Sequence, residues 1–401
     1  MIDIEELRDC YVNTSSKMVL LVVDGLGGLA HPDTRLSELE TAHIPNLDAM
    51  AQVSACGMTT PVLPGVAPGS GPGHLALFGY DPLKHVIGRG ALEALGIDVE
   101  LQPGDVAARG NFCTVDGDGL LLDRRAGRIP SELSAPICER LDRIEIEGVQ
   151  VDVFPVQDYR FVLRLRGEGL SESVTETDPQ REGVPALPVL ALNDGAQRTA
   201  DLVNEFVAQA AQLMSEEERA NMLLLRGFAQ MPSLPPMGDV YRMNPAAIAA
   251  YPMYRGLATV AGMKVIPTGR HFSDEVETMR QNYDAHDFFF IHYKPADAAG
   301  EDGDFDAKVQ RLEELDPLIP AIRELEPDVF MVAGDHATPA ITAGHSWHPV
   351  PFMLHSRLTL GEGIPAFNER ECRRGSIGSI PATNVMLLGM SHAGKMAKYG
   401  P

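Results

Sequence analysis

Three apolar stretches of about strand length each lead into side chains that could bind a metal. MVLLVVDG ends on Asp24, DFFFIHYKPADAAGE reaches Asp297 and Glu301, and VFMVAGDH ends on Asp335 and His336. In an open parallel sheet the carboxyl ends of the strands lie along one edge, where ligands bind. Carboxylates crowded at that edge repel one another and are usually neutralised by cations. The three motifs together therefore predict a metal site.

Each motif alone also fits a simpler structural role, because an Asp after a strand is commonly a turn former or a helix N-cap. The Asp335–His336 pair favours a metal, since adjacent oxygen and imidazole donors suit a transition metal. GHSWHP adds His345 and His348 nearby in the sequence. The combination of motifs, rather than any one of them, carries the prediction.

A nucleophile is suggested by PGSGPGH, which places Ser70 on a glycine-rich turn that we expect to lead into a helix. Such a turn exposes the hydroxyl and directs backbone N–H groups toward an anion. A serine alkoxide bound to a metal is a good nucleophile for phosphorus, because coordination lowers the pKa of the hydroxyl. The alternative is that GSG is only a flexible loop. Ser70 is a candidate nucleophile because the same chain carries the metal motifs.

Two different patterns of predicted secondary structure alternate along the 401 residues. Residues 1–84 and 257–401 alternate strands and helices in the α/β manner, whereas residues 85–256 contain exposed, alternating strands and an amphipathic helix. A core that is split in the sequence by a different module predicts an inserted domain. We therefore expect a metal-binding α/β core in the outer segments and an inserted domain in the middle one, which the family resemblance given below implies to be a substrate-binding lid.

The elements that must position the candidate ligands are the predicted strands 18–23, 287–293 and 329–334. VMLLGM, at 385–390, fits either a last strand or a buried helical turn.

The composition limits the classes of partner. A net charge of −23 argues against nucleic acid. A small anionic substrate remains compatible with this charge, because arginines or metals can invert the field inside one cleft. The apolar runs fall far short of the ~20 residues that span a bilayer, and the acidic N-terminus is unlike a signal peptide. We expect a cytoplasmic protein without a membrane partner, whose five scattered cysteines are reduced thiols.

These motifs, taken together, resemble a known family. The residues that carry the resemblance are VVDGLGG, PGSGPGHLALFGYDP, GRGALEALG, ARGNFCTVD, ADAAGEDGDFDAKV and GDHATPA…GHSWHPVP, in this order over nearly the whole chain. They resemble the cofactor-independent phosphoglycerate mutases of the archaeal type, within the alkaline phosphatase superfamily. The resemblance implies an alkaline-phosphatase-like three-layer α/β core with an inserted α+β lid domain. It also implies interconversion of 3-phosphoglycerate and 2-phosphoglycerate without bisphosphoglycerate, a step of glycolysis and gluconeogenesis.

The resemblance further implies two divalent metal ions, commonly Mn²⁺, with Mg²⁺, Co²⁺ and Zn²⁺ as alternatives. One ion would be held by Asp24, Ser70, Asp335 and His336, and the other by Asp297, Glu301 and His345. Ser70 would be phosphorylated transiently. Two positions depart from the pattern: Gly71 stands where many relatives have Asp, and Glu301 where many have His. Glu is a hard oxygen ligand, so it should favour Mn²⁺ or Mg²⁺ over Zn²⁺.

Arginine is the natural ligand for the substrate, because its planar fork binds carboxylate and phosphate bidentately. The candidates for substrate binding are Arg89, Arg109, Arg160, Arg226 and Arg255, together with Lys294. A structural salt bridge is the alternative role for each of them. His74 lies one helical turn after Ser70, and we expect it to be a hydrogen-bonding support rather than a catalytic group.

Other functions stay open from the residues alone. One is a related phosphotransferase, such as a homoserine kinase-like protein, although the sequence has no GxxxxGK[ST] motif for ATP. A metal-dependent phosphatase or phosphonate hydrolase on the same core would differ chiefly in the lid. A catalytically inactive, metal-stabilised binding protein is suggested by Gly71 and Glu301. The intact Ser70, Asp335 and His336 argue against this last function.

Overall fold

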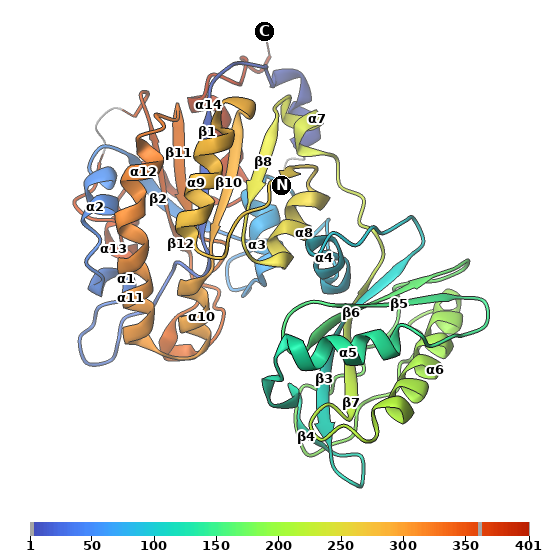
Figure 1. Cartoon of the computed structure of the whole chain (residues 1–401). Coiled ribbons are helices and arrows are strands. Elements are labelled where there is room, and N and C mark those ends of the chain that lie inside the picture. Colours follow the sequence, from blue (N-terminus) through green and yellow to red (C-terminus); the bar gives the residue numbers. More distant parts are fainter. Residues whose placement is uncertain (1–3, 360–362, 401) are drawn as a thin grey trace. The chain divides into compact units, whose positions relative to one another are not determined.

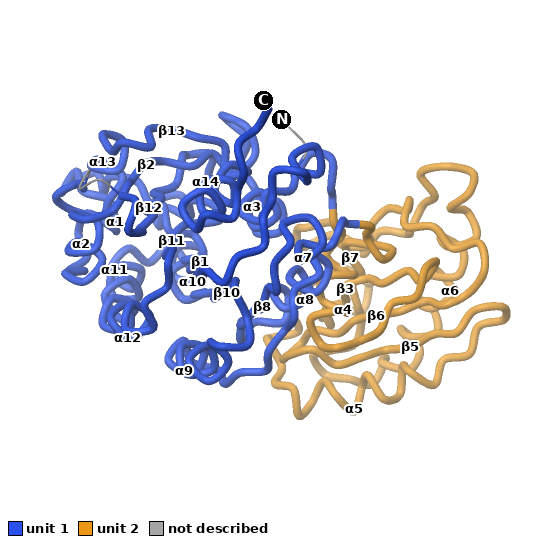
Figure 2. Tube along the Cα trace, turned by 90° about the horizontal axis from the view of Figure 1, so that it is seen from above, with its two compact units in different colours: residues 1–86, 234–401 blue, residues 87–233 orange. Residues whose placement is uncertain are grey.

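The computed structural model describes residues 4–359 and 363–400. The chain forms two compact units, shown in Figure 2: unit 1 comprises Met1–Val86 and Leu234–Pro401, and unit 2 comprises Ile87–Ser233. No helix in these described ranges is both long and apolar enough to cross a membrane.

Unit 1 is built on an eight-stranded sheet with the order β13-β2-β12-β11-β1-β10-β8-β9 (Figure 1). The strands are β1 (Met18–Val23), β2 (Ala55–Thr60), β8 (Pro245–Ile248), β9 (Lys264–Val265), β10 (Phe288–Tyr293), β11 (Val329–Ala333), β12 (Val350–Ser356) and β13 (Gly378–Pro381). β1 pairs in parallel with both β10 and β11. Every residue of these three central strands is buried, as expected for strands covered on both faces.

Helices cover both faces of this sheet. They are α1 (Glu38–Thr41), α2 (Pro45–Ala51), α3 (Ser70–Leu77), α7 (Met237–Tyr241), α8 (Pro252–Val260), α9 (Phe272–Asn282), α10 (Pro295–Glu301), α11 (Phe305–Leu315), α12 (Ile319–Arg323), α13 (Glu369–Cys372) and α14 (Asn384–His392), with 3₁₀ turns at Ile4–Cys10, Tyr283–Ala285, Asp316–Leu318 and Ala340–Thr342. Alternate residues of β1, such as Val19 and Leu21, share one core with apolar residues of α2, α9, α11 and α12. On the other face, Gly389 of α14 lies against Met18 and Met331. The result is a three-layer arrangement.

Unit 2 has its own antiparallel sheet of five strands. They are β3 (Val106–Val115), β4 (Leu121–Asp123), β5 (Gln150–Pro155), β6 (Arg160–Arg166) and β7 (Met222–Ala229), in the order β4-β3-β6-β5, with β7 also paired to β3. Its helices are α4 (Arg89–Gly96), α5 (Ser131–Leu141) and α6 (Gln197–Met214), with 3₁₀ turns at Ala126–Arg128 and Asp194–Ala196. Apolar residues of α5 and α6 share a core with one face of the sheet. On the other face, Gly90 of α4 approaches the backbone of Ala107 so closely that a Cβ would lie 2.3 Å from its carbonyl oxygen.

The predicted fold class is confirmed: an α/β core is interrupted in the sequence by an α+β unit. The structure differs from the prediction mainly at the second boundary, which lies between Ser233 and Leu234 rather than after residue 256. The reason is β8, which pairs in parallel with β10 in the large sheet. Its sequence, PAAI, begins with Pro and has a single β-branched residue, so it lacks the usual composition of a strand. The segment 385–390 lies in α14, so its helical alternative is the right one.

Candidate active site

The carboxyl ends of β10, β1 and β11 lie at the same edge of the large sheet. In the register, Val23 lies opposite Tyr293 and Val22 lies opposite Ala333. Asp24 follows β1 directly, and the β11 loop continues into Asp335, so both carboxylates are positioned by buried strands. Their side chains are fully buried. The edge predicted from the sequence therefore exists.

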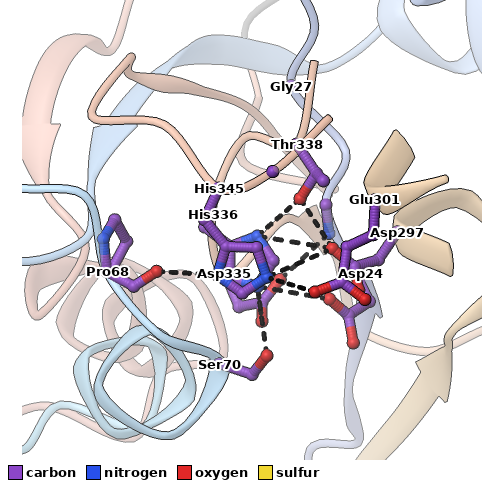
Figure 3. Close-up of polar contacts among 12 residues, drawn as sticks. Asp24, Gly27, Pro68, Ser70, Asp297, Glu301, Asp335, His336, Thr338 and His345 are labelled. Atoms are coloured by element: carbon purple, nitrogen blue, oxygen red, sulfur yellow. Dashed lines mark hydrogen bonds and ion pairs between the residues drawn. The ribbon is translucent and has the colours of Figure 1, made fainter. Parts of the chain in front are cut away.

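A first ligand group at this edge consists of Asp24, Asp335 and His336, whose ligand atoms lie within 4.8 Å of one another. His336 Nε2 is 3.0 Å from Asp335 Oδ2 and 3.4 Å from Asp24 Oδ1. Ser70 joins this group, since its Oγ is 3.1 Å from His336 Nε2 (Figure 3). Ser70 is also the first residue of α3, where free backbone N–H groups favour an anion.

The glycines around Ser70 have a packing role as well. A Cβ on Gly73 would lie 2.2 Å from the carbonyl oxygen of Asp335. α3 can approach the β11 loop this closely only because Gly73 has no side chain. PGSGPGH is therefore a close-packed helix start rather than a flexible loop.

A second ligand group consists of Asp297, His336 and His345. His345 Nε2 is 3.6 Å from Asp297 Oδ1 and 3.5 Å from Glu301 Oε1. Its ring stacks on that of His336, with centroids 3.6 Å apart, and its Nδ1 is 2.9 Å from the carbonyl oxygen of Pro68 (Figure 3). Glu301 lies beside this group but is half exposed. His348 lies outside both groups, because its Nδ1 contacts Ser346 Oγ.

Several buried side chains support Asp24 from behind. Tyr254 donates its hydroxyl hydrogen to Asp24 Oδ2, and the ring of Tyr254 stacks on His292. His292 Nε2 is 3.2 Å and Lys294 Nζ is 3.1 Å from the same oxygen. Lys294 also pairs with Asp297. Asp24 is thereby held in one orientation before any ligand arrives.

Asp335 has a matching support in His74. The Nδ1 of His74 is 2.8 Å from the carbonyl oxygen of Ser70, which accepts its hydrogen bond, and 3.2 Å from Asp335 Oδ2, an ion-pair distance. The hydrogen bond to Ser70 fits the supporting role that the sequence predicted for His74. The backbone N–H of Gly25 donates to the other oxygen of Asp335, at 3.1 Å.

The electrostatics keep both carboxylates of the first group ionised. Burial and the neighbouring Asp335 raise the pKa of Asp24, but Lys294, His292 and His336 outweigh them and bring it to about 2. Burial also raises the pKa of Asp335, but His336 and His74 hold it well below its ordinary value. Both side chains are therefore carboxylates at neutral pH.

In the second group, the pKa values of Asp297 and His345 are both raised. Burial and the charge of Asp24 raise the pKa of Asp297, against the opposing effect of Lys294. Burial lowers the pKa of His345, but its hydrogen bond to Glu301 and the charge of Asp297 outweigh this and raise it to about 9.

The donor set fits divalent cations. Asp24 Oδ1 and Asp335 Oδ2 are buried and accept no hydrogen bond within the described residues, although histidine nitrogens lie nearby. Buried acceptors without a donor are rare in native structures and suggest a ligand that the protein alone does not supply. Carboxylate oxygens and imidazole nitrogens together suit Mn²⁺ and related ions.

Comparison with known proteins agrees with this geometry. The model of the family described as 2,3-bisphosphoglycerate-independent phosphoglycerate mutase matches residues 51–220. A protein of Thermosipho melanesiensis, named as a probable enzyme of this kind, is 47% identical over 100% of both chains. A protein of Thermus thermophilus with the same name is 47% identical over 98% of both chains.

The chain belongs to the 2,3-bisphosphoglycerate-independent phosphoglycerate mutase family. Enzymes of this name are isomerases. The family resemblance predicted from the motifs is confirmed.

Solved structures share this fold, and one of them is a phosphoglycerate mutase. A cofactor-independent phosphoglycerate mutase from Thermoplasma acidophilum superposes with a TM-score of 0.69 at 27% identity, over 94% of this chain and 100% of that one. A protein from Pyrococcus horikoshii shares the fold, with a TM-score of 0.83 at 24% identity, over 96% of this chain and 99% of that one.

The candidate substrate residues of this family member fall in both units. Lys294 and Arg255 lie in unit 1, whereas Arg89, Arg109, Arg160 and Arg226 lie in unit 2. In unit 2, Arg109 of β3 lies directly opposite Arg226 of β7, and Arg160 of β6 lies opposite Asn111, two residues along β3. Residues in such positions share one face of a sheet.

Acidic side chains accompany these arginines. Arg89 and Arg109 both approach Glu93 Oε1, at 3.1 and 3.3 Å. Arg226 pairs with Glu176 at 3.4 Å. Sequence reasoning therefore found a real cluster of cations on the sheet of unit 2, while its role in substrate binding stays a prediction.

Sequence reasoning missed three residues of the site. His292 carries a visible signal, a lone histidine inside the apolar strand FFFIHY. Tyr254 directly precedes Arg255 and carries no signal of its own in the sequence. Thr338 Oγ1 donates to Asp297 Oδ1 at 2.6 Å and lies 2.9 Å from His336 Nδ1, so it links the two groups.

Proposed function

We propose that this protein interconverts 3-phosphoglycerate and 2-phosphoglycerate without bisphosphoglycerate, through a phosphoserine intermediate on Ser70. The observation that carries the proposal is the position of Ser70. Its hydroxyl lies at the start of a helix and within hydrogen-bonding distance of His336, a member of a buried carboxylate–histidine group. A serine at such a place suits phosphoryl transfer better than structural support. The names of the relatives supply the substrate.

We propose two divalent metal ions, most simply Mn²⁺, with Mg²⁺, Co²⁺ and Zn²⁺ as alternatives. The first ligand set is Asp24, Ser70, Asp335 and His336, and the second is Asp297, Glu301 and His345. Such ions would lower the pKa of the serine hydroxyl and neutralise the charge of the phosphoryl oxygens. The orphan oxygens of Asp24 and Asp335 support this assignment.

The reaction then has two symmetrical halves. Ser70 Oγ attacks the phosphorus in line, so the Ser70 O–P bond forms as the bond from phosphorus to the substrate oxygen breaks, and the proton lost by the Ser70 hydroxyl ends on the released substrate oxygen. Glycerate stays bound, and its other hydroxyl oxygen takes the phosphoryl group back from Ser70. Lys294 Nζ, which faces Asp24 and Asp297, can bind a phosphate oxygen during both halves.

We propose that the arginines of unit 2 and Arg255 bind the anionic ends of the substrate. Four of them, Arg89, Arg109, Arg160 and Arg226, belong to the unit that the sequence predicted to bind substrate. Bidentate recognition of carboxylate or phosphate is the chemistry for which arginine is best suited. Excluding water would separate a mutase from a phosphatase on the same core. A place in glycolysis and gluconeogenesis follows from this reaction.

A coupled assay tests the proposal. The protein is stripped with EDTA, Mn²⁺ is added back, and 3-phosphoglycerate is supplied without bisphosphoglycerate. Formation of 2-phosphoglycerate is followed through enolase, and free phosphate is measured in parallel. We expect turnover restored by Mn²⁺ with little release of phosphate. Ser70→Ala should abolish this turnover. Ser54→Ala is the control for loss of a serine hydroxyl, because Ser54 Oγ donates to the carbonyl oxygen of Met50, away from the ligand groups.

Three outcomes contradict the proposal in different ways. Release of phosphate without isomerisation would make the protein a phosphatase. Transfer to another acceptor only would make it a different phosphotransferase. Metal binding without turnover of either kind would favour a binding protein.

A further inference from the structure

Lys308, the fourth residue of α11, is a buried lysine with no exposed surface. Its Nζ donates three hydrogen bonds to backbone carbonyl oxygens: to Gly25 at 2.9 Å, to Gly27 at 3.0 Å and to Thr338 at 2.7 Å. Three donated bonds require all three N–H groups of an ammonium, so the arrangement is that of the charged form. Burying such a charge is costly unless it is fully bonded.

These three carbonyls belong to the two loops that carry the candidate ligands. Gly25 follows Asp24 directly, and its N–H donates to Asp335. Thr338 lies two residues after His336 and contacts both His336 and Asp297 through its hydroxyl group. One ammonium group therefore connects the loop after β1 with the loop after β11, and so connects both ligand groups.

The loops pack so closely at this point that small shifts are not tolerated. Gly25 has a φ of +66°, and a Cβ there would lie 2.7 Å from Thr338 Oγ1. Only glycine occupies such a conformation readily. The Lys308 contacts thus hold together two segments that already touch.

Two buried acids bind the same loops from the side. Glu369 accepts from the backbone N–H of Gly28 at 2.8 Å, and Glu38 accepts from that of Ala340 at 2.7 Å. Both are buried. Burial lowers the pKa of Lys308, and the charges of these two acids oppose that shift and favour the protonated ammonium. Lys308 donates to carbonyl oxygens of both loops, and the two acids accept from N–H groups of both loops. Each loop is therefore held through both its carbonyl and its N–H groups.

We propose that Lys308, with Glu38 and Glu369, is a positioning residue that fixes the loops after β1 and β11 so that both ligand groups are formed before metal binds. Lys308 contacts no reacting atom in this arrangement. The inference rests on the proposed metal-dependent function. It predicts that loss of Lys308 weakens metal binding through loop geometry, although every ligand stays in place.

The test compares two buried lysines. Lys395 is also fully buried, but its Nζ binds the carbonyl oxygen of Thr14 and Asp287 Oδ2, at the amino end of β10, opposite to the ligand edge. Lys308→Met and Lys395→Met each remove one buried ammonium. The first leaves three carbonyl oxygens without their donor, and the second leaves one carbonyl oxygen and Asp287 without theirs. Both should therefore lower the melting temperature. A purely structural role would make the two variants alike in every other respect.

Mn²⁺ affinity is the measurement that distinguishes Lys308→Met from Lys395→Met. EDTA-stripped wild type, Lys308→Met and Lys395→Met are titrated with Mn²⁺ by calorimetry. We expect Lys308→Met to bind Mn²⁺ roughly 10- to 100-fold more weakly, the range typical of lost outer support to ligands. Lys395→Met should bind like the wild type. Excess Mn²⁺ should restore most of the turnover of Lys308→Met.

Equal Mn²⁺ affinity of Lys308→Met and wild type would overturn the inference. Should Lys308→Met fail to fold, Lys308→Gln replaces it, since a neutral amide still donates to the carbonyl oxygens. The Mn²⁺ affinity of Lys308→Gln should lie between that of wild type and the range expected for Lys308→Met. A Lys308→Gln variant that binds Mn²⁺ as tightly as wild type would again overturn the inference. The calorimetry does not depend on the reaction, so wild type that binds Mn²⁺ without mutase turnover contradicts the proposed function alone.

Discussion

The two candidate ligand groups share His336 but are built very differently. Asp24, Asp335 and His336 have fully buried side chains, held from behind by a layer of aromatic and basic residues. In the other group, His345 is 23% exposed and the neighbouring Glu301 is 54% exposed. The first group lies directly at the ends of central strands, whereas the second depends on a short helix and a loop. We infer that the first group fixes the chemistry, and that the second, whose side chains are more exposed, tolerates variation.

The largest loss of turnover is expected from Ser70→Ala, which removes the proposed nucleophile from the first group. Turnover should fall by at least about 10⁴-fold, as for the loss of nucleophiles in other covalent catalysts. Metal stoichiometry measured by calorimetry should stay unchanged or fall by no more than one ion. Wild-type turnover in Ser70→Ala would remove Ser70 from the mechanism.

The support behind the first group can be weakened with Tyr254→Phe. This change removes one hydroxyl group that donates to Asp24 and leaves the stacked ring in place. Mn²⁺ affinity or turnover should fall roughly 10-fold, and by no more than about 100-fold. Tyr241→Phe is the matched control, because the buried hydroxyl of Tyr241 donates to the carbonyl oxygen of Phe78 instead. Equal effects of the two changes would mean that Tyr254 only packs.

The tolerance of the second group is tested by Glu301→His. A softer imidazole ligand should shift the ratio of Zn²⁺ to Mn²⁺ affinity toward Zn²⁺ by about tenfold. Competition titrations with the two metals measure this ratio directly. A ratio that does not move would place Glu301 outside the ligand set.

A smaller effect concerns pH. In the metal-free protein the pKa of His345 is about 9, so its imidazole is protonated at neutral pH. A metal needs the neutral ring, and Mn²⁺ affinity should therefore rise with pH up to about 9 and then level off. Glu301→Gln removes a partner that favours the protonated ring, so the pKa of His345 should fall. NMR titration of metal-free wild type and Glu301→Gln checks the direction of this shift.

The same pKa has a consequence for stability. Because the folded value lies above the ordinary value of 6.5, the protonated ring stabilises the metal-free fold fully below pH 6.5. This contribution is lost as the pH rises from 6.5 through 9. Metal-free wild type and His345→Ala should therefore differ less in melting temperature at pH 9.5 than at pH 6.

The ligand edge could be predicted because its signals are local. A buried parallel strand is a continuous apolar run, and the residue after it lies at the binding edge whatever the rest of the fold does. Asp24, Asp335 and His336 were found in this way. Among the supports, the sequence predicted His74 but not Tyr254 and Lys308, which reach the site from helices whose facing side depends on packing between distant segments. β8 was missed for a related reason, because PAAI becomes a strand only by pairing with β10.

The central claim is that two metal ions bind at the carboxyl edge of the large sheet, in the two ligand sets proposed above. Crystals soaked in Mn²⁺ and measured at the manganese absorption edge test it most directly. We expect two anomalous peaks, one among Asp24, Ser70, Asp335 and His336, and a second among Asp297, Glu301 and His345. A single peak, or strong peaks only elsewhere on the protein, would contradict the claim.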